Sequence, residues 1–128
     1  MTQTPKILVA EDERDIRELI AFSLKLSGYD VTEASNGEEA YQKAIEILPD
    51  LILLDVRMPK MTGYEACKAL KENDQTQDIP VVFLSAKGQE GEIRYGKDLG
   101  AEEYFLKPFA PDELTDRVKS ILGKYDKL

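Results

Sequence analysis

The stretch LILLDVRMPK, residues 51–60, decides the fold of this chain and raises the question of its function. Four consecutive apolar residues, 51–54, are typical of a strand that is buried on both faces of a parallel sheet. The run ends directly in a carboxylate, Asp55. Open sheets of this type bind their ligands beyond the carboxyl ends of the strands. This stretch therefore predicts both a core strand and a site residue.

The composition indicates a single acidic domain. The chain has 128 residues, of which 42% are apolar and 33% charged, a mixture typical of soluble globular proteins. No apolar run approaches the roughly 20 residues that span a bilayer. The single cysteine, Cys67, excludes a disulfide within the chain. We therefore expect one cytoplasmic domain over residues 1–128, with a core at about 6–122, no output domain and no membrane partner.

The charge and the missing histidine exclude several functions. Acidic residues number 25 and basic residues 17, and no basic cluster is present that could neutralise nucleic-acid phosphates. We therefore expect no direct binding to nucleic acid. Without histidine the chain has no histidine base, no Ser-His triad and no histidine-ligated zinc.

Short apolar runs alternate with amphipathic segments along the chain. The apolar runs predict strands at 6–10, 30–34, 51–55, 81–85 and 103–106. The segments between them predict helices over 14–27, between Ser35 and Pro49, after Thr62, within 88–100 and from Pro111. This alternation predicts a doubly wound α/β fold, with a parallel sheet covered by helices on both faces.

Local signals define some helix starts better than others. Ser35 with Glu38, and Thr62 with Glu65, each match the capping-box pattern that begins a helix. The segment 88–100 is different, because each interior glycine costs about 1 kcal/mol relative to alanine. We expect it to be a marginal helix and the part of the chain that moves most easily.

Four of the predicted strands end in chemically reactive side chains. The acid pair Glu11 and Asp12 follows the first strand, and the third, fourth and fifth end in Asp55, Ser85 and Lys107. Three converging carboxylates repel one another and would retain a proton unless a cation lay between them. Mg²⁺ suits such a set of oxygen ligands, and the prediction is Mg²⁺, or Mn²⁺ in its place.

These groups together predict phosphoryl transfer to an aspartate. Asp55 would be the nucleophile, the metal and Lys107 would neutralise charge, and Ser85 with nearby backbone N–H groups would bind the phosphoryl oxygens. Each residue alone has an ordinary interpretation, such as a first-turn acid or a surface lysine. Their joint position at the ends of four strands favours the catalytic set Asp55, Lys107 and Ser85.

With these features the sequence resembles the receiver domain of two-component response regulators, including chemotaxis-type regulators. The resemblance covers about residues 6–122 and is carried by ILVAEDE, LILLDVRMPKMTG, VVFLSA and GAEEYFLKPF. It implies a flavodoxin-like fold with five strands in the order 2-1-3-4-5. It also implies that a sensor histidine kinase or a phosphotransfer protein phosphorylates Asp55.

The resemblance implies a role for each metal-site residue. Asp12 and Asp55 would bind Mg²⁺ together with the backbone carbonyl of Arg57. Glu11 would act through water or would hold Lys107. The Arg57 side chain would overhang the phosphoryl group and tune its hydrolysis, and the peptide bond after Lys107 would be cis.

The resemblance also implies how the phosphate becomes a signal. Ser85, Ala86 and Lys107 would bind the phosphoryl group, and Ser85 would move toward it while Tyr104 turned inward. The face over residues 88–122 would then control a downstream protein target or an output domain. A homodimer through this face is also expected, formed by Asp98, Glu102, Glu103, Glu113, Arg117 and Lys119.

Three other functions are compatible with parts of this pattern. An Mg²⁺ phosphohydrolase with an aspartate nucleophile would need a second acid two residues later, where this chain has Arg57. A flavin electron carrier would need a phosphate loop after the first strand, but AEDERD is acidic. A receiver that is never phosphorylated would lack a required group, and none is missing. We therefore expect a signalling domain whose only enzymatic activities are self-phosphorylation and autodephosphorylation.

Overall fold

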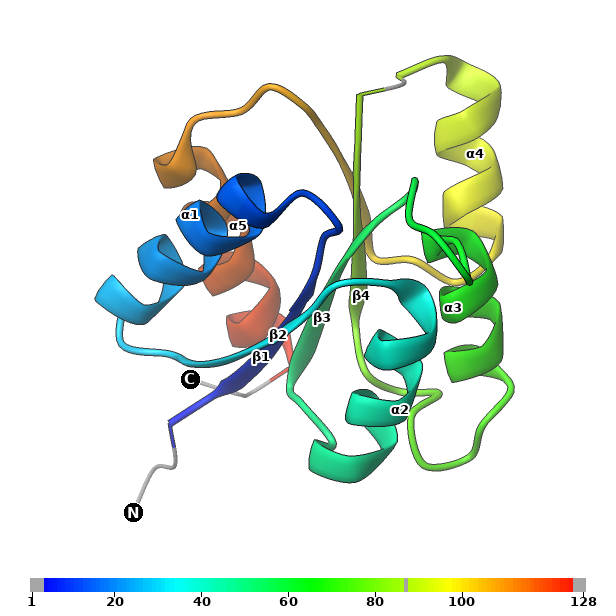
Figure 1. The fold of residues 1–128 in the computed structure, drawn as a ribbon, viewed down its shortest axis with the longest axis horizontal. Coiled ribbons are helices and arrows are strands. Elements are labelled where there is room, and N and C mark those ends of the chain that lie inside the picture. The colour runs from blue at the N-terminus through cyan, green and yellow to red at the C-terminus, as the bar shows by residue number, and fades with distance from the viewer. Residues whose placement is uncertain (1–3, 87, 126–128) are drawn as a thin grey trace.

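The computed structural model describes residues 4–86 and 88–125, and its centre is a five-stranded parallel sheet (Figure 1). The strands lie in the order β2-β1-β3-β4-β5. Their bounds are β1 Lys6–Ala10, β2 Asp30–Ala34, β3 Leu51–Asp55, β4 Val81–Ser85 and β5 Glu103–Leu106. The predicted flavodoxin-like α/β fold and its strand order are confirmed.

Helices cover both faces of the sheet. Their bounds are α1 Arg14–Leu26, α2 Gly37–Ile47, α3 Gly63–Lys71, α4 Glu90–Asp98 and α5 Pro111–Lys124. Figure 1 shows α1 and α5 on one side of the sheet and α2, α3 and α4 on the other. Within the described ranges, no helix is both long enough and apolar enough to cross a membrane.

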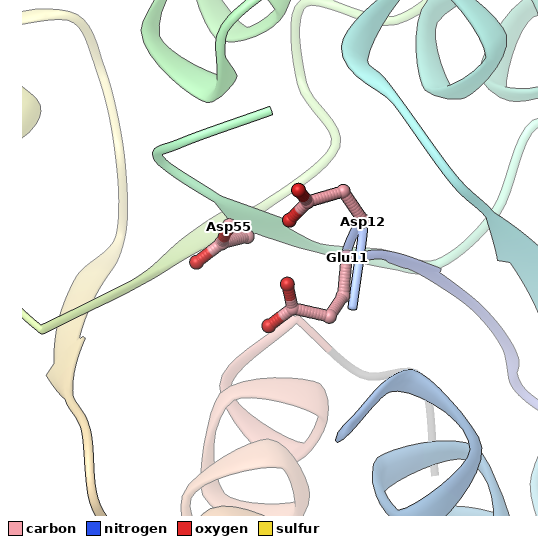
Figure 2. A group of neighbouring side chains, drawn as sticks. All are labelled: Glu11, Asp12 and Asp55. Carbon is pink, nitrogen blue, oxygen red and sulfur yellow. The ribbon is translucent and has the colours of Figure 1, made fainter. Parts of the chain in front are cut away.

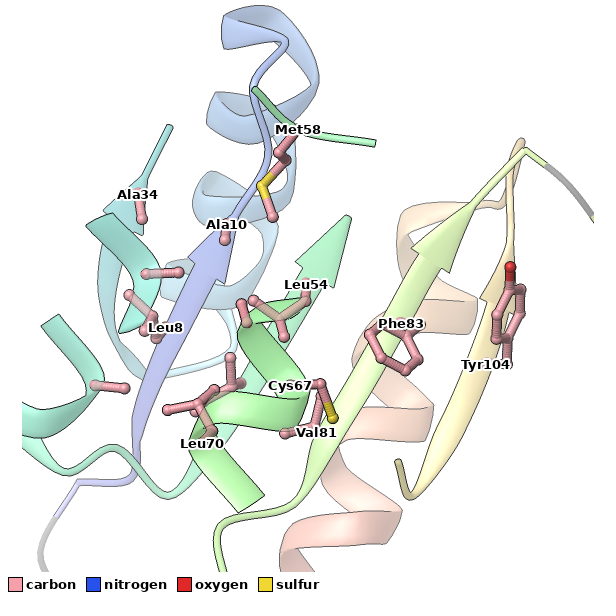
Figure 3. Packing of buried hydrophobic residues seen from close by; sticks show 14 residues of the cluster. Leu8, Ala10, Ala34, Leu54, Met58, Cys67, Leu70, Val81, Phe83 and Tyr104 are labelled. Carbon is pink, nitrogen blue, oxygen red and sulfur yellow. The ribbon is translucent and has the colours of Figure 1, made fainter. Parts of the chain in front are cut away.

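The unbroken apolar run of β3 is explained by two core layers. Ile52 and Leu54 face the layer beneath α2 and α3, which also contains Phe83 (Figure 3). Leu51 and Leu53 face the opposite layer, beneath α1 and α5. All four leucine and isoleucine side chains of β3 are fully buried. Such burial anchors the strand, so that Asp55 at its end has a well-defined position.

The helix starts confirm one predicted capping box and correct the other. Thr62 and Glu65 form a complete capping box at the start of α3. The start of α2 was predicted one residue too early, because Asn36 is the N-cap and its Oδ1 accepts a hydrogen bond from the N–H of Glu39 at 2.8 Å. Ser35 instead donates its hydroxyl to the Glu39 carboxylate. An asparagine carbonyl serves the same capping purpose as a serine hydroxyl.

The glycine-bearing segment forms helix α4, and one of its glycines is needed for packing. Gly96 is buried, and a Cβ there would lie 2.9 Å from the ring of Tyr104 and 3.0 Å from the ring of Phe83. The glycine therefore lets α4 approach the sheet closely. This close approach offsets part of the cost of glycine within a helix.

Candidate functional site

Three carboxylates meet at the carboxyl ends of β1 and β3. One oxygen atom from each of Glu11, Asp12 and Asp55 lies within 4.8 Å of the others, and Figure 2 shows the three side chains gathered around one space. Glu11 is fully buried and Asp55 is 5% exposed, whereas Asp12 is exposed to solvent. The neighbouring positions of β1 and β3 in the sheet bring these residues together.

Lys107 lies between the two buried carboxylates. Its Nζ is 2.5 Å from Glu11 Oε1 and 2.9 Å from Asp55 Oδ1. Its backbone N–H donates to the carbonyl of Ser85 at 2.8 Å, which ties the end of β5 to the end of β4. The peptide bond between Lys107 and Pro108 is cis, as the resemblance implies. Of the two roles predicted for Glu11, action through water or a contact with Lys107, the structure shows the contact with Lys107.

Two of these acids, Asp12 and Asp55, border an open cleft of about 320 Å³ together with Lys107. Its walls are formed by Asp12, Glu13, Asp55, Arg57, Ser85, Ala86 and Lys107. Apart from Glu13, every one of these residues was predicted to bind metal or phosphate. Glu11 is fully buried and accepts a hydrogen bond from Lys107. The exposed Asp12 and Arg57 at the cleft give a ligand access from solvent.

Burial favours the uncharged forms of the two buried carboxylic acids, Glu11 and Asp55. Burial raises the pKa of Glu11 from 4.5 to about 7, against the opposing hydrogen bond from Lys107. Burial also raises the pKa of Asp55, and again the hydrogen bond from Lys107 opposes the shift. Burial by itself lowers the pKa of Lys107, but its hydrogen bonds to Glu11 and Asp55 raise that pKa above 10.5. The ammonium therefore stays charged.

The donor set fits a hard divalent cation. Lys107 is a single positive charge next to Glu11 and Asp55, and the exposed Asp12 adds a third carboxylate. Oxygen donors that carry net negative charge are the ligands that Mg²⁺ and similar ions prefer. The acidic cluster is therefore a candidate metal site.

The start of α3 packs directly against the backbone of Asp55, a contact that was not predicted from the sequence. A Cβ on Gly63 would lie 2.2 Å from the carbonyl oxygen of Asp55, so only glycine fits there. The N–H of Gly63 also donates to the carbonyl of Val56 at 3.0 Å. In the stretch LILLDVRMPKMTG, Met58 and Pro59 precede this glycine by five and four residues, and that spacing was the signal that could have identified its role.

Tyr104 is buried in an aromatic cluster with its hydroxyl paired. The side chain is 8% exposed, and its ring lies 6.0 Å from that of Phe83. Its hydroxyl oxygen is 3.0 Å from the hydroxyl oxygen of Tyr64 on α3. The ring of Tyr64 in turn makes edge contacts with Phe83 and with Tyr95 on α4. In this structure Tyr104 already lies inward, and its predicted switch role with Ser85 stays a prediction.

Substituting Tyr64 with phenylalanine is expected to lower the free energy of unfolding by about 1 kcal/mol. The substitution keeps the ring contacts but leaves the part-buried hydroxyl of Tyr104 without its partner on α3. Urea denaturation followed by circular dichroism measures the effect. The control is Tyr95→Phe, whose side chain is 52% exposed and should change stability little. Equal stability of wild type and Tyr64→Phe would contradict the expectation.

Part of the predicted dimer face is engaged within the chain. The Glu102 carboxylate accepts hydrogen bonds from Lys124 at 2.6 Å and from the Tyr125 hydroxyl at 2.8 Å. Arg117 lies 3.8 Å from Glu103. The remaining predicted residues are exposed on α4 and α5, namely Asp98, Glu113 and Lys119. These contacts lie within one chain and do not test the homodimer, which stays a prediction.

The comparisons with known proteins agree with this geometry. The family model described as response regulator receiver domain matches residues 7–119. The chain is 49% identical over 119 residues to the alkaline phosphatase synthesis transcriptional regulatory protein PhoP of Bacillus subtilis, covering 93% of this chain. The structure of the chemotaxis protein CheY4 of Vibrio cholerae is similar, with a TM-score of 0.89 and 33% identity. That likeness covers 94% of this chain and all of the other.

The relatives contradict the predicted set of partners, which excluded nucleic acid. A third relative, 38% identical over 97% of this chain, is the DNA-binding dual master transcriptional regulator RpaA of Synechocystis. The chain spans about half of these curated relatives, 49% of PhoP and 52% of RpaA. A net charge counted over the matched half carries no information about basic residues in the other half of such a relative. The exclusion of nucleic acid is therefore wrong.

Proposed function

This chain belongs to the response regulator receiver domain family, and we propose that it accepts a phosphoryl group on Asp55 with the help of Mg²⁺. The supporting observation is the contact of Lys107 with Asp55 at 2.9 Å beside two further carboxylates. A nucleophilic carboxylate, a mobile cation and a cluster of oxygen ligands are the groups that phosphoryl transfer requires.

Asp12, Asp55 and the backbone carbonyl of Arg57 are the proposed Mg²⁺ ligands, with Glu11 acting through water. When bound, the ion supplies positive charge that offsets the negative charge of the phosphoryl oxygens. Mn²⁺ has the same preference for oxygen ligands and is the proposed substitute. Lys107 contributes a second positive charge, since its ammonium already contacts both buried acids.

The transfer itself uses groups that border the cleft. The phosphoryl group comes from a phosphohistidine of the donor protein. An Asp55 oxygen forms the new bond to phosphorus while the bond from phosphorus to the histidine nitrogen of the donor breaks. The donor nitrogen keeps the electron pair and takes up a proton. Lys107, the Ser85 hydroxyl and the backbone N–H of Ala86 bind the phosphoryl oxygens, and positioning of this kind supplies most of the catalysis. Attack of water on the same phosphorus later releases phosphate and restores Asp55.

The donor that we propose is a sensor histidine kinase or a phosphotransfer protein, and the output is control of transcription. The relatives named as transcriptional regulators support this output. Phosphorylation adds about −1.5 to −2 units of charge, which would act on Ser85 and Tyr104 and through them on the face over residues 88–122. The single domain over residues 1–128 and its cytoplasmic location stay predictions from the sequence.

Metal dependence tests the proposal. The full chain is incubated with acetyl phosphate in Mg²⁺, in Mn²⁺ and in excess chelator, and its intact mass is measured. We expect a phosphoryl adduct with either metal and none with chelator, because the acidic cluster otherwise repels the donor. Asp12→Asn should need a higher Mg²⁺ concentration for half-maximal modification. An adduct of equal yield in chelator would refute the metal requirement.

A further inference from the structure

Arg17 on α1 contacts the backbone of the acidic pair, although it is not one of the residues that border the cleft. Its Nη1 donates to the carbonyl oxygen of Glu11 at 2.9 Å. Its Nε donates to Glu33 Oε1 on β2 at 3.1 Å. The Arg17 side chain is only 17% exposed, so these hydrogen bonds are largely shielded from water. A planar guanidinium held at two points has a well-defined orientation.

The contact completes the hydrogen bonding of the Glu11 backbone. The N–H of Glu11 donates to the carbonyl of Ala34 on β2 at 3.1 Å, one step beyond the paired residues of β1 and β2. Its carbonyl accepts from Arg17. Beyond this residue the sheet no longer holds the chain, and the next residue is the exposed Asp12. Arg17 therefore holds the carbonyl end of the peptide that joins Glu11 to Asp12.

We propose that Arg17 is a positioning residue for the metal site. It orients the peptide between Glu11 and Asp12, so that the side chain of Asp12 leaves the backbone toward Asp55. The proposal rests on the proposed function, since it concerns the same Mg²⁺ site. In metal sites, groups that orient the ligands by hydrogen bonds without binding the metal themselves raise the affinity for the metal.

Removing Arg17 has two opposite effects on cation binding, and this allows a sharp test. Loss of a positive charge near an acidic cluster should by itself strengthen the binding of a cation. Loss of the hydrogen bond to the Glu11 carbonyl should weaken it, because Asp12 is no longer held in place. A weaker Mg²⁺ affinity in Arg17→Met would therefore indicate a positioning role. Removal of the charge alone would give a stronger Mg²⁺ affinity.

The experiment measures Mg²⁺ binding to the full chain by isothermal titration calorimetry. We expect Arg17→Met to weaken the Mg²⁺ affinity about tenfold. Arg17→Lys keeps the charge but has one donor nitrogen in place of three, and it should restore part of the lost Mg²⁺ affinity. Arg14→Met is the matched control, because Arg14 lies on the same helix but forms its salt bridge with the exposed Glu18. Its Mg²⁺ affinity should equal that of wild type or exceed it slightly.

A further control separates the two contacts of Arg17. Glu33→Gln weakens the pairing with β2 but leaves the hydrogen bond to the Glu11 carbonyl available. We expect Mg²⁺ affinity close to wild type in this variant. A loss in Glu33→Gln as large as in Arg17→Met would mean that Arg17 acts through the packing of β2, and the proposal would be overturned.

The remaining outcomes distinguish this proposal from the proposed function. Wild type and Asp12→Asn are titrated alongside, and absence of Mg²⁺ binding to wild type would refute the proposed function. If wild type binds and Asp12→Asn binds weakly, then unchanged or tighter binding by Arg17→Met overturns only the role of Arg17. Urea denaturation shows whether Arg17→Met is folded. If it is not, the affinity of the folded Arg17→Lys decides, weaker binding supporting the role and wild-type binding overturning it.

Discussion

Asp55→Asn is expected to abolish phosphorylation of this chain. The wild-type protein, incubated with Mg²⁺ and acetyl phosphate, should gain the mass of one phosphoryl group, and the variant should gain none. The amide has almost the same shape as the carboxylate but lacks a nucleophilic oxygen that can form an acyl phosphate. Asp55 is 5% exposed at the end of a fully buried strand, so its place beside Lys107 is well defined.

The matched control for this experiment is Asp98→Asn. Asp98 is an exposed acid on α4, away from the cleft, and the variant should be phosphorylated like wild type. An acyl phosphate is cleaved by hydroxylamine, whereas a phosphate ester on serine or tyrosine is not. An adduct on Asp55→Asn, or one on wild type that resists hydroxylamine, would show that another residue is modified.

The metal-free protein is expected to lose stability as the pH rises from about 5 to about 8. Glu11 has a pKa of about 7 in the folded protein against 4.5 when unfolded, so folding favours its protonated form. Its contribution to stability is fully present below the unfolded pKa and is lost as the pH rises through the folded pKa. The difference of pKa corresponds to a loss of about 3 kcal/mol, and the raised pKa of Asp55 acts in the same direction.

Urea denaturation in chelator at several pH values measures this effect. Other acids, such as Glu39 and Glu102, have lowered pKa values because of their lysine partners, and they titrate below this pH window. Glu11→Gln isolates the effect, because it removes the titrating group and should flatten the curve. Saturating Mg²⁺ should restore stability at the upper end of the range, because only the folded state assembles the site. A wild-type curve that rises over this range would contradict the assignment.

Several parts of the site could be predicted from the sequence because each follows a strand. The predicted site residues all follow or end strongly apolar strands, namely Glu11, Asp12, Asp55, Ser85 and Lys107. Parallel strands bring their carboxyl ends to one edge of the sheet, so these residues were expected to meet there. The cap of α2 was misplaced by one residue because Ser35 and Asn36 are both good N-caps and the sequence does not rank them. The exclusion of nucleic acid failed for a different reason, since charge in one part of a protein does not describe the rest.

By itself the sequence determined the alternation of strands and helices, and with it the edge of the sheet at which the reactive residues collect. The reason is that periodicity and burial are local properties that each segment carries in its own residues. Only the tertiary structure decided which atoms meet: it chose the contact with Lys107 from the two roles open to Glu11, and it paired the hydroxyl groups of Tyr64 and Tyr104. The contact of Arg17 with the Glu11 carbonyl belongs to the same class, because it depends on how α1 packs against the sheet. Packing of this kind is set by the whole core, and no single segment encodes it.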